Sequence, residues 1–167
     1  GPAIEYADGG KEWYIEGLKL TEAEFNEKIN KSSDMTVDFD GNKIWKNNKG
    51  LLNREDGPAI ESKNGNKEWW VNGKCHREDG PAIEYVCGCK AWWTNGNWKK
   101  TEFYNEEGQL HNPDKPAVER ADGSKEWWLH GNLHRCKDQQ PAVERADGSK
   151  EWWHRGKYIR TEWHNKD

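Results

Sequence analysis

Paired glutamates recur along the sequence, and they are the first residues that suggest chemistry. Two carboxyl groups held close together can act as acid and base, as in a glycosidase, or can bind a hard cation. A catalytic pair is usually unique, whereas these pairs recur at the same position of almost every repeat. Repetition therefore favours a solvated row of charges balanced by Lys125, Lys150 and Arg120. The pairs are Glu5 with Glu12, Glu61 with Glu68, Glu119 with Glu126, and Glu144 with Glu151.

Adjacent aromatic residues are the second recurring feature in a chain that contains 12 tryptophans. If the second ring of each pair points outward, it can stack on a sugar or nucleobase, and a row of such rings forms a platform. The alternative is burial against a second layer or a neighbouring subunit, because a single sheet has little core of its own. With the glutamates, we expect these rings to form a ligand or partner face: Tyr14, Trp70, Trp93, Trp128 and Trp153.

The cysteines offer a weaker candidate site. Cys87 and Cys89 flank a glycine in a turn, and Cys75 and His76 lie one unit away, so a zinc site with three cysteines and one histidine is conceivable. The C-x-C spacing is unusual for structural zinc, and the other turns lack it. A chance pair of substitutions or a local disulfide is the favoured alternative, and we expect no metal and no cofactor.

The histidines do not form a catalytic arrangement. His76, His134 and His164 recur in the short return segments before a basic or polar residue, which favours packing or hydrogen bonding. No serine or cysteine with triad-like surroundings accompanies them, and no glycine-rich phosphate loop is present. The sequence thus predicts that the protein is not an enzyme.

These residues belong to a repeat. The stretch PAVERADGSKEWW occupies 116–128 and returns unchanged at 141–153, and looser copies begin at Pro2, Pro58 and Pro81. Identity over so long a stretch indicates a repeat protein. The Asp-Gly between two strand-like runs predicts a β-hairpin, and a following Gly turn leads the chain into a short third segment.

The register of this hairpin depends on the length of its turn. A two-residue Asp-Gly turn places Val118 opposite Trp127 and Glu119 opposite Glu126, which makes the first Trp of each pair the core residue and the second the outward one. A three-residue turn with a glycine bulge shifts the register by one residue.

A mainly β fold follows: an elongated, MORN-like stack of hairpin repeats in a single curved or twisted sheet. One short helix is expected over 21–29, where Thr21 and Glu24 have capping-box spacing and Ala23, Phe25 and Ile29 supply an apolar side that covers the adjacent sheet edge or face. We treat 1–167 as one repeat domain. Its expected units are 1–19, 36–56 (divergent), 57–79, 80–111 (with an extra half-unit), 115–138 and 140–167.

Composition argues against two classes of partner. The net charge of −4 is modest and the signs are interleaved, so no basic stripe exists for nucleic acid. No apolar run approaches the roughly 20 residues that cross a bilayer, which argues against a membrane. No leader is recognisable, although a removed signal would leave no trace, and the localisation stays open. The apolar fraction is only 32%, so aromatic rings must supply much of the core.

The two ends of the chain match in phase. The tail stops where regular units continue with Gly-Pro-Ala, and the chain begins with those residues. Three interpretations stay open: a longer array, further residues that cap both ends, or separate chains stacked head to tail through exposed strand edges. In the last case the contact involves Gly1, Pro2, Ala3, Trp163, His164 and Asp167.

The stretch from His76 to Ala82, followed by Trp92-Trp93 and Asn95-Gly96, resembles the H-R-x-D-G-P-A tryptophan repeats of phages, large DNA viruses and bacteria. These are related in style to MORN-type repeats. The resemblance covers most of the chain except 20–56, and it implies a scaffold, a lipid-associated module, or an immunity or antitoxin component of viral or phage origin. The strict MORN glycine and tyrosine pattern is absent, so membrane binding is not implied.

The function expected from these observations is non-enzymatic. We expect a binding or assembly module that associates with itself head to tail, as a filament, or with another protein. One alternative is a soluble binder or sponge for a small carbohydrate or nucleotide, such as a viral counter-defence protein, with the ligand between Trp128 and Trp153. The second alternative is a glycosidase-like enzyme that uses a glutamate pair.

Overall fold

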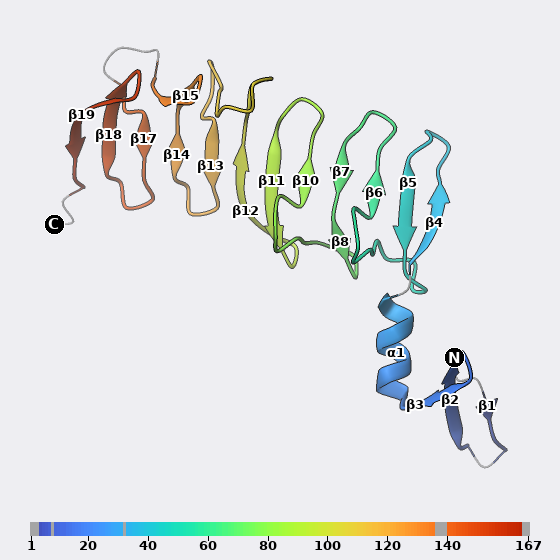
Figure 1. Cartoon of the computed structure of the whole chain (residues 1–167). Helices are drawn as coiled ribbons and strands as arrows, with labels where there is room; N and C mark the ends of the chain where they lie inside the picture. The colour runs from blue at the N-terminus through green and yellow to red at the C-terminus, as the bar shows by residue number, and fades with distance from the viewer. Residues whose placement is uncertain (1–3, 8, 32, 136–139, 165–167) are drawn as a thin grey trace.

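The protein is mainly β, with one helix in the part of the chain that the structure describes. The computed structural model describes residues 4–7, 9–31, 33–135 and 140–164. A 12-stranded antiparallel sheet dominates it, in the order β19-β18-β17-β14-β13-β12-β11-β10-β7-β6-β5-β4 (Figure 1). Its strands are β4 (Asp34–Val37), β5 (Lys43–Lys46), β6 (Ile60–Glu61), β7 (Lys67–Glu68), β10 (Ile83–Glu84), β11 (Lys90–Thr94), β12 (Asn97–Glu102), β13 (Val118–Arg120), β14 (Lys125–Glu126), β17 (Val143–Glu144), β18 (Lys150–His154) and β19 (Lys157–Glu162).

A second, three-stranded sheet carries the helix at the N-terminal end. It consists of β1 (Ile4–Glu5), β2 (Lys11–Ile15) and β3 (Leu18–Leu20), and helix α1 (Glu22–Lys31) packs on β2 and β3. Two short return hairpins complete the fold, β8 (Trp70–Val71) with β9 (Lys74–Cys75), and β15 (Trp128–Leu129) with β16 (Asn132–Leu133). The described part of the chain has no helix long and apolar enough to span a membrane.

The capping box of α1 is confirmed. The Thr21 N–H donates to Glu24 Oε2 at 2.8 Å, and the Glu24 N–H donates to Thr21 Oγ1 at 3.2 Å. Phe25 is buried, and its ring centroid lies 5.0 Å from that of Trp13 on β2. The expected apolar side is wrong at Ala23, which is exposed, and the side chain of Ile29 lies outside the described residues.

The hairpin turns have three residues. The Arg120 N–H donates to the Ser124 carbonyl at 3.0 Å, which leaves Ala121, Asp122 and Gly123 as the loop. Gly123 adopts φ +90°, a left-handed conformation that favours glycine, as the bulge position requires. Asp122 Oδ1 also accepts a hydrogen bond from the Ser124 N–H at 2.8 Å. The bulged alternative is therefore the one that forms.

This turn corrects the expected carboxylate pairs. Val118 lies opposite Glu126, and Glu119 lies opposite Lys125. Since neighbouring residues of a strand point to opposite faces, Glu119 and Glu126 do not share a face. The same register recurs in the other hairpins, so Glu5, Glu61 and Glu144 each lie opposite a lysine, and the pairs with Glu12, Glu68 and Glu151 are likewise wrong.

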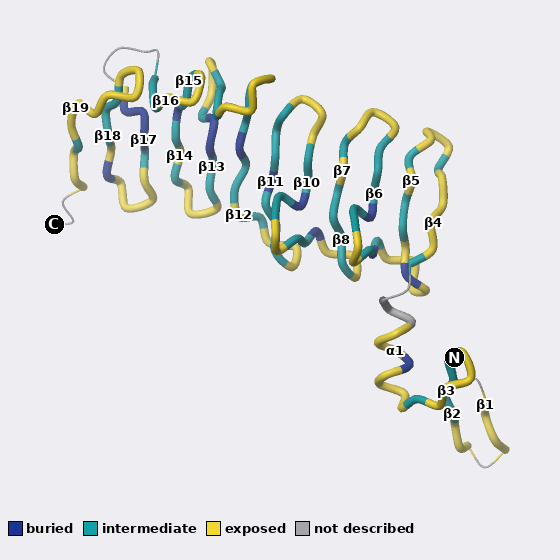
Figure 2. Tube along the Cα trace, viewed as in Figure 1, coloured by how far each residue is buried: buried dark blue, intermediate teal, exposed yellow. Residues whose placement is uncertain are grey.

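Fully buried alanines form the thin core between units. In each junction, the backbone N–H of the first aromatic residue donates to an alanine carbonyl of the next unit, as from Trp127 to Ala142 at 2.9 Å. A larger side chain has no room at these positions. Figure 2 shows buried segments as short patches inside a largely half-buried sheet. The buried alanines are Ala59, Ala82, Ala117 and Ala142.

Strand β12 inverts the array. Ile83 lies opposite Ala91, Ala91 opposite Thr101, and Thr101 opposite Glu119, so these four residues form one row across the sheet. Val118, which corresponds to Ile83 in its own unit, lies in the neighbouring row. Equivalent side chains therefore point to opposite faces before and after β12. Figure 1 shows the same inversion in the backbone: the β6–β7 and β10–β11 turns lie at one edge of the sheet, and the β13–β14 and β17–β18 turns lie at the other.

Candidate functional site

An arginine clamp explains the R-x-D-G-P motif. Arg77 donates from Nε to Asp79 Oδ1 at 2.8 Å, and from Nη1 to the Pro81 carbonyl at 3.2 Å and Glu84 Oε1 at 3.1 Å. Its Cζ lies 4.0 Å from the centroid of the Trp69 ring, which is a cation–π geometry. The hydrogen bond and charge of Arg77 lower the pKa of Asp79. The clamp joins the first Trp of one unit to the glutamate of the next.

The same clamp recurs at two other junctions. Arg54 binds Asp56, the Pro58 carbonyl and Glu61. Its Cζ lies 4.0 Å from the centroid of the Trp45 ring. Arg135 donates to the Pro141 carbonyl at 3.1 Å and to Glu144 at 2.9 Å, 3.7 Å above Trp127. The first aromatic residue of each of these units is thus covered by a cation. Glu61 and Glu144 serve the clamp.

The glycine of the motif lies against the clamp. A Cβ at Gly80 would lie 3.0 Å from Arg77 Cζ, which is tighter than most real Cβ contacts, so the guanidinium would have to shift by a few tenths of an ångström. In the extra half-unit Asn112 stands in place of the arginine, and Lys115 in place of the glycine. At the Arg135 clamp, Gln140 precedes Pro141, so the arginine does not require a glycine at every junction. The clamp arginines were not singled out from the sequence.

The second aromatic residue binds the glutamate two positions before it, on the same side of the strand. Trp128 Nε1 donates to Glu126 Oε2 at 2.8 Å, and Tyr104 donates its hydroxyl to Glu102. This contact holds the ring against the carboxylate of its own strand. The remaining members of the set are Trp70 with Glu68 at 3.0 Å, Trp153 with Glu151 at 2.9 Å, and Tyr14 with Glu12 at 2.9 Å.

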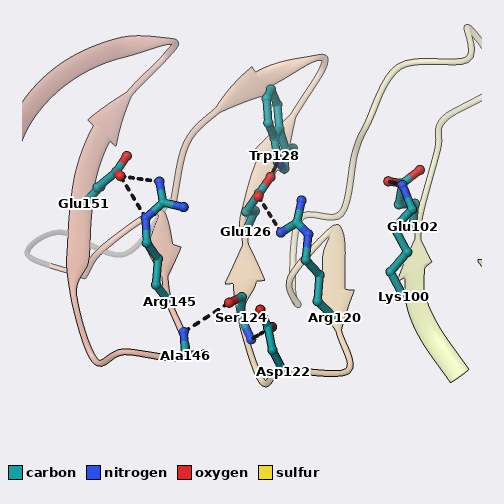
Figure 3. A network of polar contacts seen from close by, with 10 residues as sticks. All are labelled: Lys100, Glu102, Arg120, Asp122, Ser124, Glu126, Trp128, Arg145, Ala146 and Glu151. Atoms are coloured by element: carbon teal, nitrogen blue, oxygen red, sulfur yellow. Dashed lines mark hydrogen bonds and ion pairs between the residues drawn. The ribbon is translucent and has the colours of Figure 1, made fainter.

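A basic residue completes most of these contacts. Figure 3 shows Arg120 beside Glu126, with Nη1 2.6 Å from Oε1, and Arg145 beside Glu151. Burial raises the pKa of Glu151, but hydrogen bonds from Arg145 and Trp153 outweigh that effect and lower it below its usual value. A carboxylate held in this ionised, doubly bonded form is unsuited to donate a proton.

The expected row of outward rings does not lie on a single face. Trp70, Trp93, Trp128, Trp153 and Tyr14 are all half-buried. Because of the inversion at β12, Trp70 and Trp93 lie on the opposite face from Trp128 and Trp153. The structure therefore brings the ring of each unit to its own glutamate rather than to the rings of all other units.

The cysteines do not form a metal site within the described residues. Cys75 is buried, Cys87 is exposed and Cys89 is half-buried, and all three are free thiols, so of the two alternatives to zinc the local disulfide is not formed. No group of three or more metal-ligating side chains occurs in the described part of the chain. Burial, and to a smaller extent the charge of Glu68, raises the pKa of Cys75 to about 11.

Alkylation should separate these thiols. At pH 8 Cys75 is protonated and covered, because its pKa lies well above the pH, whereas Cys87 is exposed. We expect iodoacetamide to modify Cys87 at least about tenfold faster than Cys75, as followed by peptide mass spectrometry. In urea, where both thiols are exposed, the two rates should become similar. Comparable rates already in the native protein would show that Cys75 is accessible.

The end residues are described only in part. Trp163 is 75% exposed and His164 is exposed, just after β19. Gly1, Pro2, Ala3 and Asp167 lie outside the described residues. In the described part of the chain, β19 pairs only with β18 and β1 pairs only with β2, so each strand has one edge without a partner strand.

Function rests on this geometry, because neither family models nor curated proteins match the sequence.

Proposed function

We propose that the protein is a non-enzymatic scaffold that assembles by adding the first strand of one copy to the last strand of another. The same proposal includes an elongated, MORN-like stack of repeats that is related to the tryptophan repeats of viruses and phages. One observation carries it: β19 pairs with its preceding strand in the same register as β12 does, and β12 already holds a further strand, β13, within the chain.

The hairpins β11–β12 and β18–β19 are copies of one another. Both carry a register shift after the first Trp, at Trp92/Trp93 and Trp152/Trp153. In both, a cation from the second strand lies 4.2 Å from that first ring, Lys100 over Trp92 and Arg160 over Trp152. The edges that they present to the next strand are therefore equivalent.

The internal copy defines the bonding pattern of that edge. β12 pairs with β13 so that Thr101 lies opposite Glu119, the Phe103 N–H donates to the Ala117 carbonyl at 2.8 Å, and the Ala121 N–H donates to the Lys99 carbonyl at 2.7 Å. By equivalence, Ile159, Thr161 and Trp163 direct their backbone groups to the open side of β19. An unpaired edge of this kind is a template for another strand.

β1 has the sequence that this template accepts. Ile4-Glu5-Tyr6 corresponds to Val118-Glu119-Arg120, and its register with β2 equals that of β13 with β14. In the internal register, Glu5 of a second copy lies opposite Thr161, Ile4 lies opposite Glu162, and the Ala7 N–H donates to the Ile159 carbonyl. The occupant is therefore a second copy of this chain.

Proline substitutions test the contact. Thr161→Pro removes an N–H that faces away from β18, so it should weaken association at least about tenfold while the hairpin persists. Sedimentation velocity over a concentration series measures this, with Val37→Pro on the opposite sheet edge as the matched control. A wild-type protein that stays monomeric at every concentration contradicts the proposal.

A mixing experiment tests whether the contact joins β1 of one copy to β19 of another. Thr161→Pro blocks the β19 edge and leaves β1 free, whereas Glu5→Pro blocks β1 and leaves β19 free. Each variant alone should be monomeric where the wild type associates, and their mixture should give dimers and nothing larger. Larger species in the mixture would show that other surfaces carry the association.

A further inference from the structure

One unit lacks the glutamate that binds the second aromatic ring in the other units. At Trp93 the residue two positions earlier is Ala91, which is buried. As a result, Trp93 Nε1 is buried and has no hydrogen-bond partner among the described residues. A buried donor without a partner costs roughly 1–3 kcal/mol, so this position favours any molecule that supplies an acceptor.

The missing side chain leaves a pocket on the same face. The pocket has a volume of 470 Å³, and its walls are aromatic and aliphatic. This volume is within the range of about 300–1,000 Å³ that is typical of small-molecule sites. Thr101, which also lines it, already accepts a hydrogen bond from Trp98 Nε1 at 3.0 Å. The principal lining residues are Ile83, Tyr85, Cys89, Trp93, Trp98 and Phe103.

The lining decides the charge of the guest. In the second half of the sheet, Arg120 and Arg145 neutralise the glutamates that fill the equivalent space. Tyr85 takes the place of that arginine here, and no charged residue lines the pocket. A buried carboxylate would therefore lack a counter-charge, whereas a neutral oxygen acceptor costs far less to bury.

We propose that this pocket binds a small, uncharged, largely apolar molecule with a flat ring and one carbonyl-type oxygen. The ring packs between Trp93, Trp98 and Phe103, and the oxygen accepts the hydrogen bond from Trp93 Nε1. The inference rests on Ala91 and Trp93 and does not depend on strand-edge assembly.

A pair of fluorinated probes tests the acceptor. 4-Fluoroacetophenone carries the ring and the carbonyl, and 1-fluoro-4-isopropylbenzene replaces the carbonyl oxygen by a methyl group. We expect the ketone to bind at least about fivefold more tightly in ¹⁹F NMR titrations and to shift the indole N–H resonance of Trp93. No binding of the ketone, or equal binding of both probes, overturns the proposal.

Two variants locate the site. Ala91→Glu restores the side chain of the other units, so it should satisfy Trp93 as Glu68 satisfies Trp70, fill the pocket and abolish binding of both probes. Trp93→Phe keeps the ring and removes the donor, so it should reduce ketone binding to the level of the hydrocarbon. Wild-type ketone affinity in either variant places the probe elsewhere and sinks the assignment. Trp93→Phe keeps the test decisive should Ala91→Glu fail to fold.

Discussion

Replacement of Trp127 by alanine should lower the free energy of unfolding by about 3–5 kcal/mol. Trp127 is only 8% exposed, and the guanidinium of Arg135 lies 3.7 Å above its ring. The sheet is one layer thick at this point, so few side chains are available to collapse into the space that the ring leaves. The substitution also removes the cation–π contact that holds Arg135 over the junction.

Urea unfolding followed by circular dichroism measures this loss. Phe39→Ala is the matched control, because Phe39 is a large aromatic residue that is fully exposed, and its truncation should change stability by less than about 0.5 kcal/mol. Similar losses in the two variants would mean that Trp127 contributes no more to the junction than a surface ring does.

The second large effect concerns the arginine clamp. Gly80→Ala should destabilise the protein by up to about 1 kcal/mol, because its methyl group would push the Arg77 guanidinium a few tenths of an ångström relative to Asp79 and Glu84. Arg77→Ala alone should cost about 2–3 kcal/mol through lost charged hydrogen bonds and ring contact. In the Arg77→Ala background, Gly80→Ala should cost less than about 0.5 kcal/mol.

The coupling between the two substitutions is the quantity that matters. A double-mutant cycle from urea unfolding should give an interaction of about 0.5 kcal/mol. Additive losses would show that the glycine is needed for the backbone rather than for the arginine. The half-unit with Asn112 and Lys115 already combines both changes, which is why we expect the double variant to fold.

Local features of the fold were predictable from the sequence. The capping box of α1 is encoded by Thr21 and Glu24, three residues apart, and both of its hydrogen bonds form. The hairpins follow from Asp-Gly between strand-like runs. These signals depend on neighbouring residues only, and so a single sequence is sufficient to locate them.

The register was not predictable to the same degree. Asp-Gly is compatible with a two-residue turn and with a bulged three-residue turn, and the difference moves Glu119 from Glu126 to Lys125. One residue of slip turns a candidate catalytic pair into two unrelated carboxylates on opposite faces. The pair hypothesis therefore depended on the least certain feature of the sequence.

The arginine clamp and the Ala91 pocket required contacts between units. Arg77 reaches Trp69 in its own unit and Glu84 in the next, and neither distance follows from the repeat pattern alone. The replacement of glutamate by Ala91 was visible in the sequence. Its effect on Trp93 became evident only once the glutamates of the other units were found to bind the second ring.

The single extra strand β12, between the β10–β11 and β13–β14 hairpins, decides which repeats a partner can contact at the same time. A rigid partner on one face meets arginine-covered rings on one side of β12 and glutamate-bound rings on the other. Because β19 copies β12, a unit added there would return to the first orientation. Each single extra strand such as β12 thus reverses the face to which equivalent side chains point. Units separated by one such strand point to opposite faces, and units separated by two point to the same face.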